Sequence, residues 1–155
     1  MQIDPINWKI LQVLQKNARI SNAALARQLG LSAPAVSERI KKMEDSGVIK
    51  GYHAEVSHIE SGHQLKAIIT LRAFMGRLKS FLEKVHDFPE VLNCYRITGE
   101  ENIILEVVLF DQFHMEAFID TLITYGETKT HIVLSAVIDG APIRTRKNSE
   151  KRGGL

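Results

Sequence analysis

The sequence LARQLGLSAPAVSERIKKM, at residues 25–43, is the most informative stretch of this chain. Its apolar residues recur every three or four positions, which predicts two amphipathic helices. Gly30 can end the first helix and Ser32 can cap the second, so only a very short turn separates them. Two helices joined by a short turn that contains glycine are typical of a helix-turn-helix.

The residues around this pair extend it to a larger unit. Residues 5–16 have a helical period, with Asp4 as a cap, and predict a helix before the pair. Ser21 can cap the next helix, and the third helix is expected to end near residue 46. From residues 48 to 56 the pattern changes to that of a short strand or β-ribbon. Three helices and such a ribbon predict a winged helix-turn-helix.

The second half of the chain alternates strand and helix patterns in the order β-α-β-β-α-β. The expected strands are residues 65–74, 91–98, 102–110 and 128–138, and the expected helices are residues 78–85 and 115–122. This order predicts a ferredoxin-like domain, in which an antiparallel sheet carries both helices on one face. The fold class is therefore α+β. The expected parts are a winged helix-turn-helix at 1–52, a hinge at 53–64, a βαββαβ domain at 65–140 and a basic tail at 141–155.

One face of that sheet has no helix to cover it. Residues 103–110 are apolar at nearly every position, as are residues 132–134. Strands of this composition are buried on both faces. Since the chain has no spare segment, a second copy of the same sheet is the expected cover, which predicts a two-fold homodimer.

The net charge of +2 is unevenly distributed along the chain. Residues 1–52 hold eight Lys or Arg and four Asp or Glu, and residues 144–155 hold five and one, so each segment carries +4. Residues 53–143 hold seven and thirteen, which gives −6. Basic ends favour contact with a polyanion such as double-stranded DNA. For residues 144–155 a solvated tail is the preferred interpretation, with an extra DNA contact as the alternative.

The second helix of the pair leaves one face free for DNA. Small residues at its start allow it to enter the major groove. Ser37 and Glu38 can reach base edges, Glu38 by accepting a hydrogen bond from cytosine N4, whereas basic side chains hold phosphates. The expected DNA-binding residues are Ser21, Ser32, Ala33, Pro34, Ser37, Glu38, Arg39, Lys41 and Lys42. A plain three-helix bundle with a basic solvent face is the alternative.

Other chemistries lack support in the sequence. It contains no dinucleotide, P-loop or nucleophile-elbow motif, and its histidines lack the spacing of zinc ligands. The adjacent Glu100 and Glu101 are expected to be solvated, and the single Cys94 fits a reducing compartment. Neither an apolar span nor a signal peptide is present. We expect a cytoplasmic protein that is not an enzyme, with no catalytic residue, metal, cofactor or membrane partner.

Several motifs, taken in order, resemble the leucine-responsive regulator and AsnC family, the feast/famine regulators of prokaryotes. They are ID at 3–4, NARIS at 17–21, LGLSAPAVSERIKKMEDSGVIKGY at 29–52 and CYRITGEENIILEV at 94–107. The resemblance implies a winged helix-turn-helix, a hinge strand and a βαββαβ ligand-regulation domain. It also implies dimers that often assemble into tetramers or octamers.

The resemblance further implies an amino-acid effector bound between dimers. The effector residues that it implies here are Thr98, Gly99, Glu100, Asn102, Tyr125, Gly126, Thr130, His131, Ile132 and Val133. Asn102 and Asn7 depart from the family pattern, because an acidic residue usually stands at each position. An amide offers an ammonium group only dipoles and hydrogen bonds, so we expect weaker binding or a different ligand.

The combined prediction is a sequence-specific DNA-binding transcription regulator whose oligomeric assembly is modulated by a small effector, an amino acid or a relative. One alternative is an architectural DNA-wrapping protein of the same fold that needs no effector. A second alternative is a stand-alone amino-acid-binding or enzymatic module whose helical half contacts only proteins.

Overall fold

The computed structural model describes residues 3–145, which form two compact units. Within the described part, the first unit consists of residues 3–54 together with 138–145, and the second consists of residues 55–137. None of the helices in the described part is long and apolar enough to cross a membrane. Residues 146–155, the larger part of the expected basic tail, lie outside the described residues.

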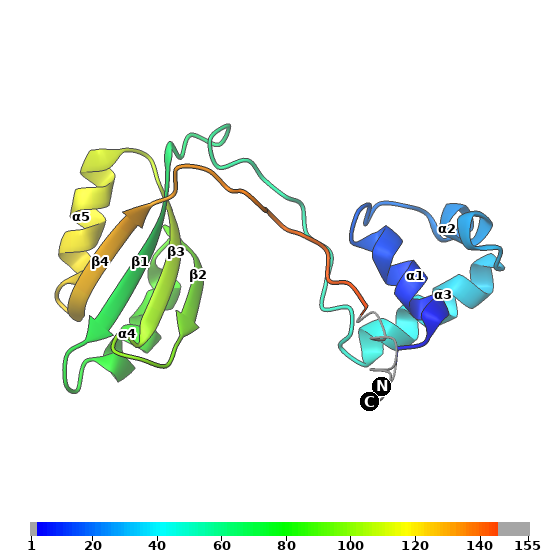
Figure 1. Cartoon of the computed structure of the whole chain (residues 1–155), viewed down its shortest axis with the longest axis horizontal. Helices are drawn as coiled ribbons and strands as arrows, with labels where there is room; N and C mark the ends of the chain where they lie inside the picture. Colours follow the sequence, from blue (N-terminus) through cyan, green and yellow to red (C-terminus); the bar gives the residue numbers. More distant parts are fainter. Residues whose placement is uncertain (1–2, 146–155) are drawn as a thin grey trace, which may run out of the picture. The chain divides into compact units, whose positions relative to one another are not determined.

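The first unit contains the three predicted helices (Figure 1). They are α1 (Pro5–Leu14), α2 (Asn22–Leu29) and α3 (Ala33–Asp45). Asp4, Ser21 and Ser32 each cap one helix by accepting a hydrogen bond from the backbone N–H three residues further on. Gly30 ends α2 in the left-handed conformation, with φ of 67°. The predicted helices and caps are therefore confirmed.

The helices of the first unit enclose one apolar core. Ile10, Leu25 and Val36 come from α1, α2 and α3 and are fully buried. Burial of such a side chain stabilises a fold by about 1.5–3 kcal/mol. The core therefore fixes α3 against the other two helices.

The β-ribbon expected over residues 48–56 is wrong for the single chain. The described residues between α3 and the first sheet strand contain no strand. Val48 and Ile49 instead pack on the helical core, and the Tyr52 hydroxyl donates to a Glu44 carboxylate oxygen at 2.8 Å. A ribbon needs a second segment to complete its ladder of hydrogen bonds, and residues 3–145 supply none at that place.

The second unit has the predicted β-α-β-β-α-β order. Its elements are β1 (Leu65–Ala73), α4 (Leu78–Lys84), a short 3-10 helix η1 (Val85–Asp87), β2 (Val91–Arg96), β3 (Ile103–Leu109), α5 (Gln112–Leu122) and β4 (Gly126–Ile132). The strands lie in the order β2-β3-β1-β4, and each neighbouring pair is antiparallel. Phe81 of α4 and Phe118 of α5 join the same core as Ile69 of β1, so both helices cover one face of the sheet (Figure 1).

The last strand is shorter than predicted, because β4 ends at Ile132 rather than at residue 138. Ile132 pairs with Ala67, and the Val133 amide donates to the Lys66 carbonyl oxygen at 2.8 Å. Beyond Ala67, β1 has only Lys66 and Leu65 left, too few to pair with residues as far as 138. The apolar run after Ile132 therefore leaves the sheet, and Leu134 is exposed.

The face of the sheet opposite the helices is mixed rather than uniformly apolar. Alternation in β1 and β3 places Ile68 and Ile104 on it, together with an ion pair between Lys66 and Glu106 at 2.7 Å. The Lys66 and Asn93 side chains hold the pKa of Glu106 below its usual value. The Thr70 hydroxyl also lies on this face and is buried without a hydrogen-bond partner in the described structure. A partner that covers this apolar centre must also match the fixed polar groups around it, which restricts the orientation of the partner.

Gly126 of β4 lies against the backbone of β1 with no room for a side chain. A Cβ atom there would lie 2.3 Å from the Arg72 carbonyl oxygen and 2.8 Å from the Ala73 Cα. We expect Gly126→Ala to lower the free energy of unfolding by about 2 kcal/mol, because backbone must move to admit the methyl group. Urea denaturation followed by circular dichroism measures this loss.

Gly62→Ala is the matched control, because the space around that glycine is open and only its φ of 96° opposes a side chain. Its expected cost is about 1 kcal/mol. Equal losses in the two variants would contradict the assignment of Gly126 to a steric role.

Candidate nucleic-acid interface and effector region

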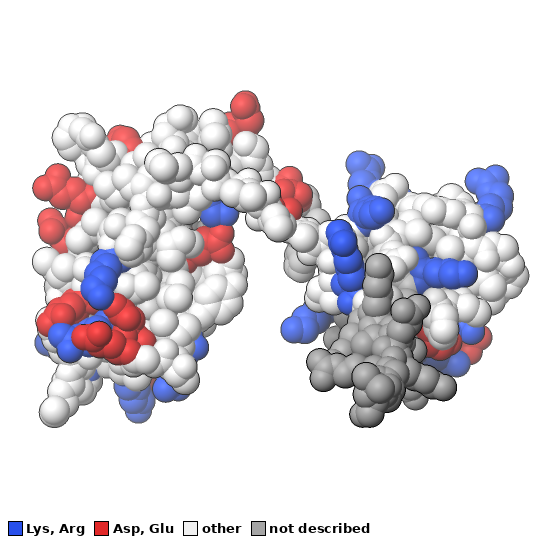
Figure 2. Space-filling view, in the orientation of Figure 1, with Lys and Arg blue, Asp and Glu red and all other residues white. Residues whose placement is uncertain are grey.

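One face of α3 is exposed along its length. Val36, Ile40 and Met43 bury the opposite face in the core. The residues on the exposed side are Ser32, Pro34, Ser37, Glu38, Lys41 and Lys42, while Ala33 is half-buried. Lys and Arg side chains project from several sides of this unit (Figure 2). Most of the predicted DNA-binding residues are thus brought together on one surface.

Ser21 and Ser32 have a local role in addition to any ligand contact. Their hydroxyl oxygens accept from the backbone N–H groups of Ala24 at 3.1 Å and Ala35 at 3.3 Å. Ser21 begins α2, so it lies apart from the exposed face of α3. A capping hydroxyl keeps its own proton available as a donor, and the start of a helix favours anions.

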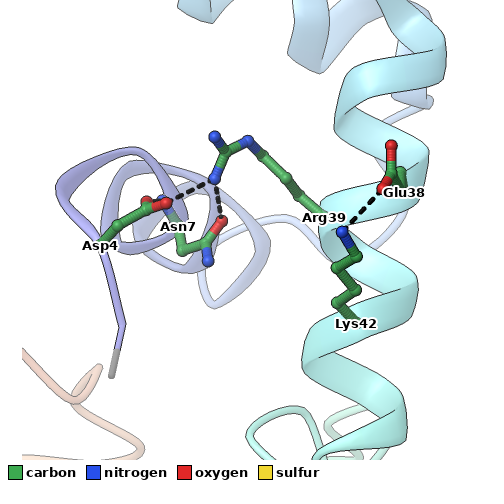
Figure 3. Close-up of polar contacts among 5 residues, drawn as sticks. All are labelled: Asp4, Asn7, Glu38, Arg39 and Lys42. Carbon is green, nitrogen blue, oxygen red and sulfur yellow. Dashed lines mark hydrogen bonds and ion pairs between the residues drawn. The ribbon is translucent and has the colours of Figure 1, made fainter. Parts of the chain in front are cut away.

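Arg39 is half-buried beside the exposed face, and its predicted contact with phosphate stays a prediction. Its guanidinium donates to the Asp4 carboxylate at 2.6 Å and to the Asn7 side-chain oxygen at 2.9 Å (Figure 3). These bonds join α3 to the start of α1. Asn7, only 4% exposed, is the one buried polar residue in the described core, and Arg39 supplies a partner for its side-chain oxygen.

The sequence offered a signal for this contact. Asp4 and Asn7 are three residues apart, so they lie on one face at the start of α1. The Asn7 backbone amide and the Arg39 guanidinium hold the pKa of Asp4 below its usual value. The angle between α1 and α3, which brings Arg39 to them, has no local pattern from which it could be predicted.

Glu38 and Lys42 pair with each other in the free protein. They are one helical turn apart, and their charged atoms are 2.7 Å apart (Figure 3). The hydrogen bond and positive charge of Lys42 lower the pKa of Glu38. Both side chains are about two-thirds exposed, so water screens the pair and DNA can exchange it for new contacts.

The predicted effector loop between β2 and β3 is tied to the end of β1 by Asn102. Its side-chain oxygen accepts from the Ala73 amide at 3.1 Å, and its own backbone amide donates to the Leu71 carbonyl oxygen at 3.2 Å. Asn102 therefore holds the loop in place in this structure. Its side-chain oxygen is already engaged within the chain.

A small hollow of about 120 Å³ lies beside this loop. Its lining residues are Arg72, Glu100, Glu101, Glu127, Thr128 and Lys129. Two ion pairs cross it, Arg72 with Glu127 and Lys129 with Glu101. Hydrogen bonding to Lys129 lowers the pKa of Glu101, and bonding to Glu127 raises the pKa of Arg72. Of these six residues, only Glu100 was in the predicted effector set.

The remaining predicted effector residues are distributed over different surfaces. Tyr125 packs on the sheet core, where its ring meets that of Phe81 edge-on at 5.5 Å between centroids. Thr130 pairs with Ile69 and so lies on the helix-covered face, whereas the exposed His131 lies on the opposite face. Thr98 and Gly99 are in the loop. A single chain therefore does not gather the predicted set into one pocket.

No metal site is formed by the described residues, because no three His, Cys, Asp or Glu side chains cluster among them. Burial raises the pKa of the Cys94 thiol, which keeps the sulfur protonated and weakly nucleophilic.

An exposed recognition helix on a capped three-helix unit, joined to a βαββαβ sheet domain, defines a DNA-binding transcription regulator. Comparison with known families gives the same class. The sequence model of the winged helix-turn-helix DNA-binding family matches residues 3–50, and that of the Lrp/AsnC ligand binding domain matches residues 66–143. The chain belongs to the Lrp/AsnC family, whose members are regulators and not enzymes.

Relatives extend over nearly the whole chain. An HTH-type transcriptional regulator of Bacillus subtilis, LrpC, is 30% identical over 88% of this chain and 95% of its own length. Its solved structure superimposes with a TM-score of 0.86, covering 89% of this chain and 99% of that one. The structure of a regulator from Neisseria meningitidis in complex with L-Met is 29% identical, with a TM-score of 0.87, and covers 92% of this chain and 96% of that one.

The charge on Asp4 makes the stability of the first unit dependent on pH. Folding lowers the pKa of Asp4, so its contribution is complete above the unfolded-state value of about 3.9 and is lost as the pH falls through the folded-state value. Asp4→Asn keeps a capping side chain but removes the charge. We expect the variant to be less stable than the parent near neutral pH and equally stable at the lowest pH.

Unfolding is followed by the fluorescence of Trp8, which is the only tryptophan and packs on the core of this unit. Asp120→Asn, an exposed change on α5 in the other unit, is the control. A stability difference for Asp4→Asn that does not vary with pH would rule out the charge as its cause.

Proposed function

We propose that this regulator binds specific operators as a homodimer, with α3 in the major groove, and that a small effector modulates its assembly. It would act in the cytoplasm, where prokaryotic DNA is found. The main support is the exposed face of α3, which presents polar and basic side chains while its apolar side chains are fully engaged in the core. The dimer would read half-sites about 34 Å apart or at multiples of that distance.

The proposed roles differ along α3. Ser32, Ala33 and Pro34 at its start allow close approach to the duplex, and Ser37 and Glu38 contact base edges. Lys41 and Lys42 contact phosphates, which orient the helix without selecting a sequence. On binding, Lys42 exchanges its partner Glu38 for phosphate, and Glu38 is then free to accept from cytosine.

The homodimer is proposed from the uncovered face of the sheet. Ile68, Ile104 and Val108 give this face an apolar centre, which favours burial against another surface. A second copy can also offer a partner to the buried Thr70 hydroxyl. We propose that the effector acts on the assembly of these dimers into higher oligomers.

We propose that the effector is an amino acid or a related zwitterion. A hollow of about 120 Å³ is well below the volume of typical ligand pockets, about 300–1,000 Å³, so an oligomer would have to complete the site. Its paired cations and carboxylates are suited to a ligand with both charges. The regulator from Neisseria meningitidis and a feast or famine regulatory protein from Mycobacterium tuberculosis were each solved with methionine, which supports this ligand class.

An effector-independent, architectural DNA-wrapping protein is the second candidate. Asn102 supports it, because its side-chain oxygen is engaged with the Ala73 amide and it has no charge for an ammonium group. In that case the ion pairs beside the loop would serve only stability.

The roles proposed along α3 predict different effects for two groups of variants. We expect Lys41→Ala or Lys42→Ala to weaken binding to all duplexes by about tenfold, with a salt dependence reduced by about one phosphate contact. We expect Ser37→Ala or Glu38→Gln to change the preference between bases by about 1–3 kcal/mol. Binding is measured with a selected operator and with random duplex as competitor.

Equal losses on every duplex from both groups of variants would contradict this division of roles. Random duplex that competes as well as the operator against the parent protein would support the architectural candidate instead.

The effector is tested by calorimetry with the twenty amino acids on the parent and on Asn102→Asp. The added carboxylate is expected to strengthen binding of any ligand with an ammonium group. Size measurements in the presence of the best ligand then test for a change of assembly. Heat from neither protein would remove the amino-acid hypothesis while leaving DNA binding untouched.

A further inference from the structure

A groove of about 650 Å³ lies beside α1, within the first unit. Its lining includes Trp8 and Leu11 of α1, residues 48–53 and, from the segment after the sheet domain, Gly140 and Ile143. Pockets that hold small molecules typically have volumes of about 300–1,000 Å³. The groove is therefore large enough for such a ligand, unlike the hollow beside the loop between β2 and β3.

Hydrogen bonds fix the part of the groove that Ile143 supplies. The side-chain amide of Gln15, which follows α1, accepts from the Ile143 backbone N–H at 2.7 Å and donates to the Ile143 carbonyl oxygen at 3.0 Å. A primary amide that bonds both backbone groups of one residue holds the chain in one position and direction. The Ile143 side chain takes no part in these bonds and is left to line the groove.

Exposed apolar side chains of the first unit gather at this groove. In its described part, the large apolar residues that are exposed are Tyr52, Ile138 and Ile143. Two of the three, Tyr52 and Ile143, line the groove, and Trp8 beside them is half-buried. Exposed apolar surface in a hollow of this size favours a ligand with an apolar body.

The charged groups of the lining favour an anion. Lys50 and His53 line the groove and are exposed, whereas the described lining residues include no Asp or Glu. The adjoining groove, by contrast, has both Glu44 and Asp45 in its lining. A carboxylate on the ligand can therefore pair with the Lys50 ammonium without meeting a like charge in the groove.

The groove also borders the proposed DNA-reading surface. Leu14, Ala18 and Tyr52 line both this groove and the adjoining one, which is lined in addition by Ser37 and Lys41 of α3. A ligand in the groove would thus lie next to the exposed face of α3.

We propose that the groove beside α1 is a second small-molecule site, which binds an apolar carboxylate with its chain or ring against Trp8 and Ile143 and its carboxylate at Lys50. It is separate from the hollow beside the loop between β2 and β3, which lies in the other unit and is lined by charges of both signs. The inference does not depend on DNA binding or on an effector in the sheet domain.

Binding is measured on the full-length protein with two dyes that differ in one charged group, anilinonaphthalene sulfonate and the neutral phenylnaphthylamine. Trp8 is the only tryptophan and lines the groove, so a dye bound there accepts its excitation energy. We expect saturable energy transfer to both dyes. Octanoate should displace them at a lower concentration than octanol, because only octanoate offers a carboxylate to Lys50.

Two substitutions separate the apolar contact from the charge. Ile143→Glu should weaken binding of both dyes about tenfold, because it replaces an apolar contact with a charge. Lys50→Gln should weaken binding of the sulfonate about threefold, as expected of one exposed charge pair, and leave the neutral dye unchanged. The matched controls are Ile138→Glu and Lys9→Gln, which change exposed residues of the same unit outside the described lining and should have no effect.

Unchanged affinity for both dyes in Ile143→Glu, or no saturable energy transfer in the parent, would overturn the site. Circular dichroism of each variant confirms that the fold is retained. An equal response of the two dyes to Lys50→Gln, or equal displacement by octanol and octanoate, would overturn the carboxylate as the ligand class.

Discussion

The structure of the DNA-binding unit depends on how completely the inner face of α3 is buried. Val36 and Met43 are fully enclosed and Ile40 nearly so, which leaves the helix no freedom to turn about its axis. The outer face therefore takes no part in the core, although Ser32 on it caps the helix. Arg39 adds a polar restraint through Asp4 and Asn7, which fixes α3 relative to the start of α1. Buried packing and one charged contact together determine which side chains meet a ligand.

The sequence predicted the helices, their caps and the order of the sheet domain, because each depends on local patterns. Ser21, Ser32 and Gly30 indicate helix ends through their own chemistry. The exposed side of α3 follows from the same periodicity. The same periodicity could not show that Arg39, next to the exposed stripe, pairs with the distant Asp4 and Asn7.

The effector region was less predictable, because it depends on strand register and on other copies of the chain. Arg72 and Glu127 lie 55 residues apart and meet only through the antiparallel pairing of β1 with β4. The length of β4 was overestimated because an apolar run continues past the point where β1 can pair with it. The strand at residues 48–56 was overestimated in the same way, since these residues have a strand's composition but no partner within the described part of the chain.

The return of residues 138–145 to the first unit makes the βαββαβ unit an insertion within the DNA-binding unit. Two covalent connections, near residues 54 and 138, link the units in place of one hinge. Any rearrangement of the sheet unit must then be accommodated by both connections at once. A fragment that ends at residue 54 would lack a wall of the groove beside α1, so the natural boundary of the DNA-binding unit is discontinuous in sequence.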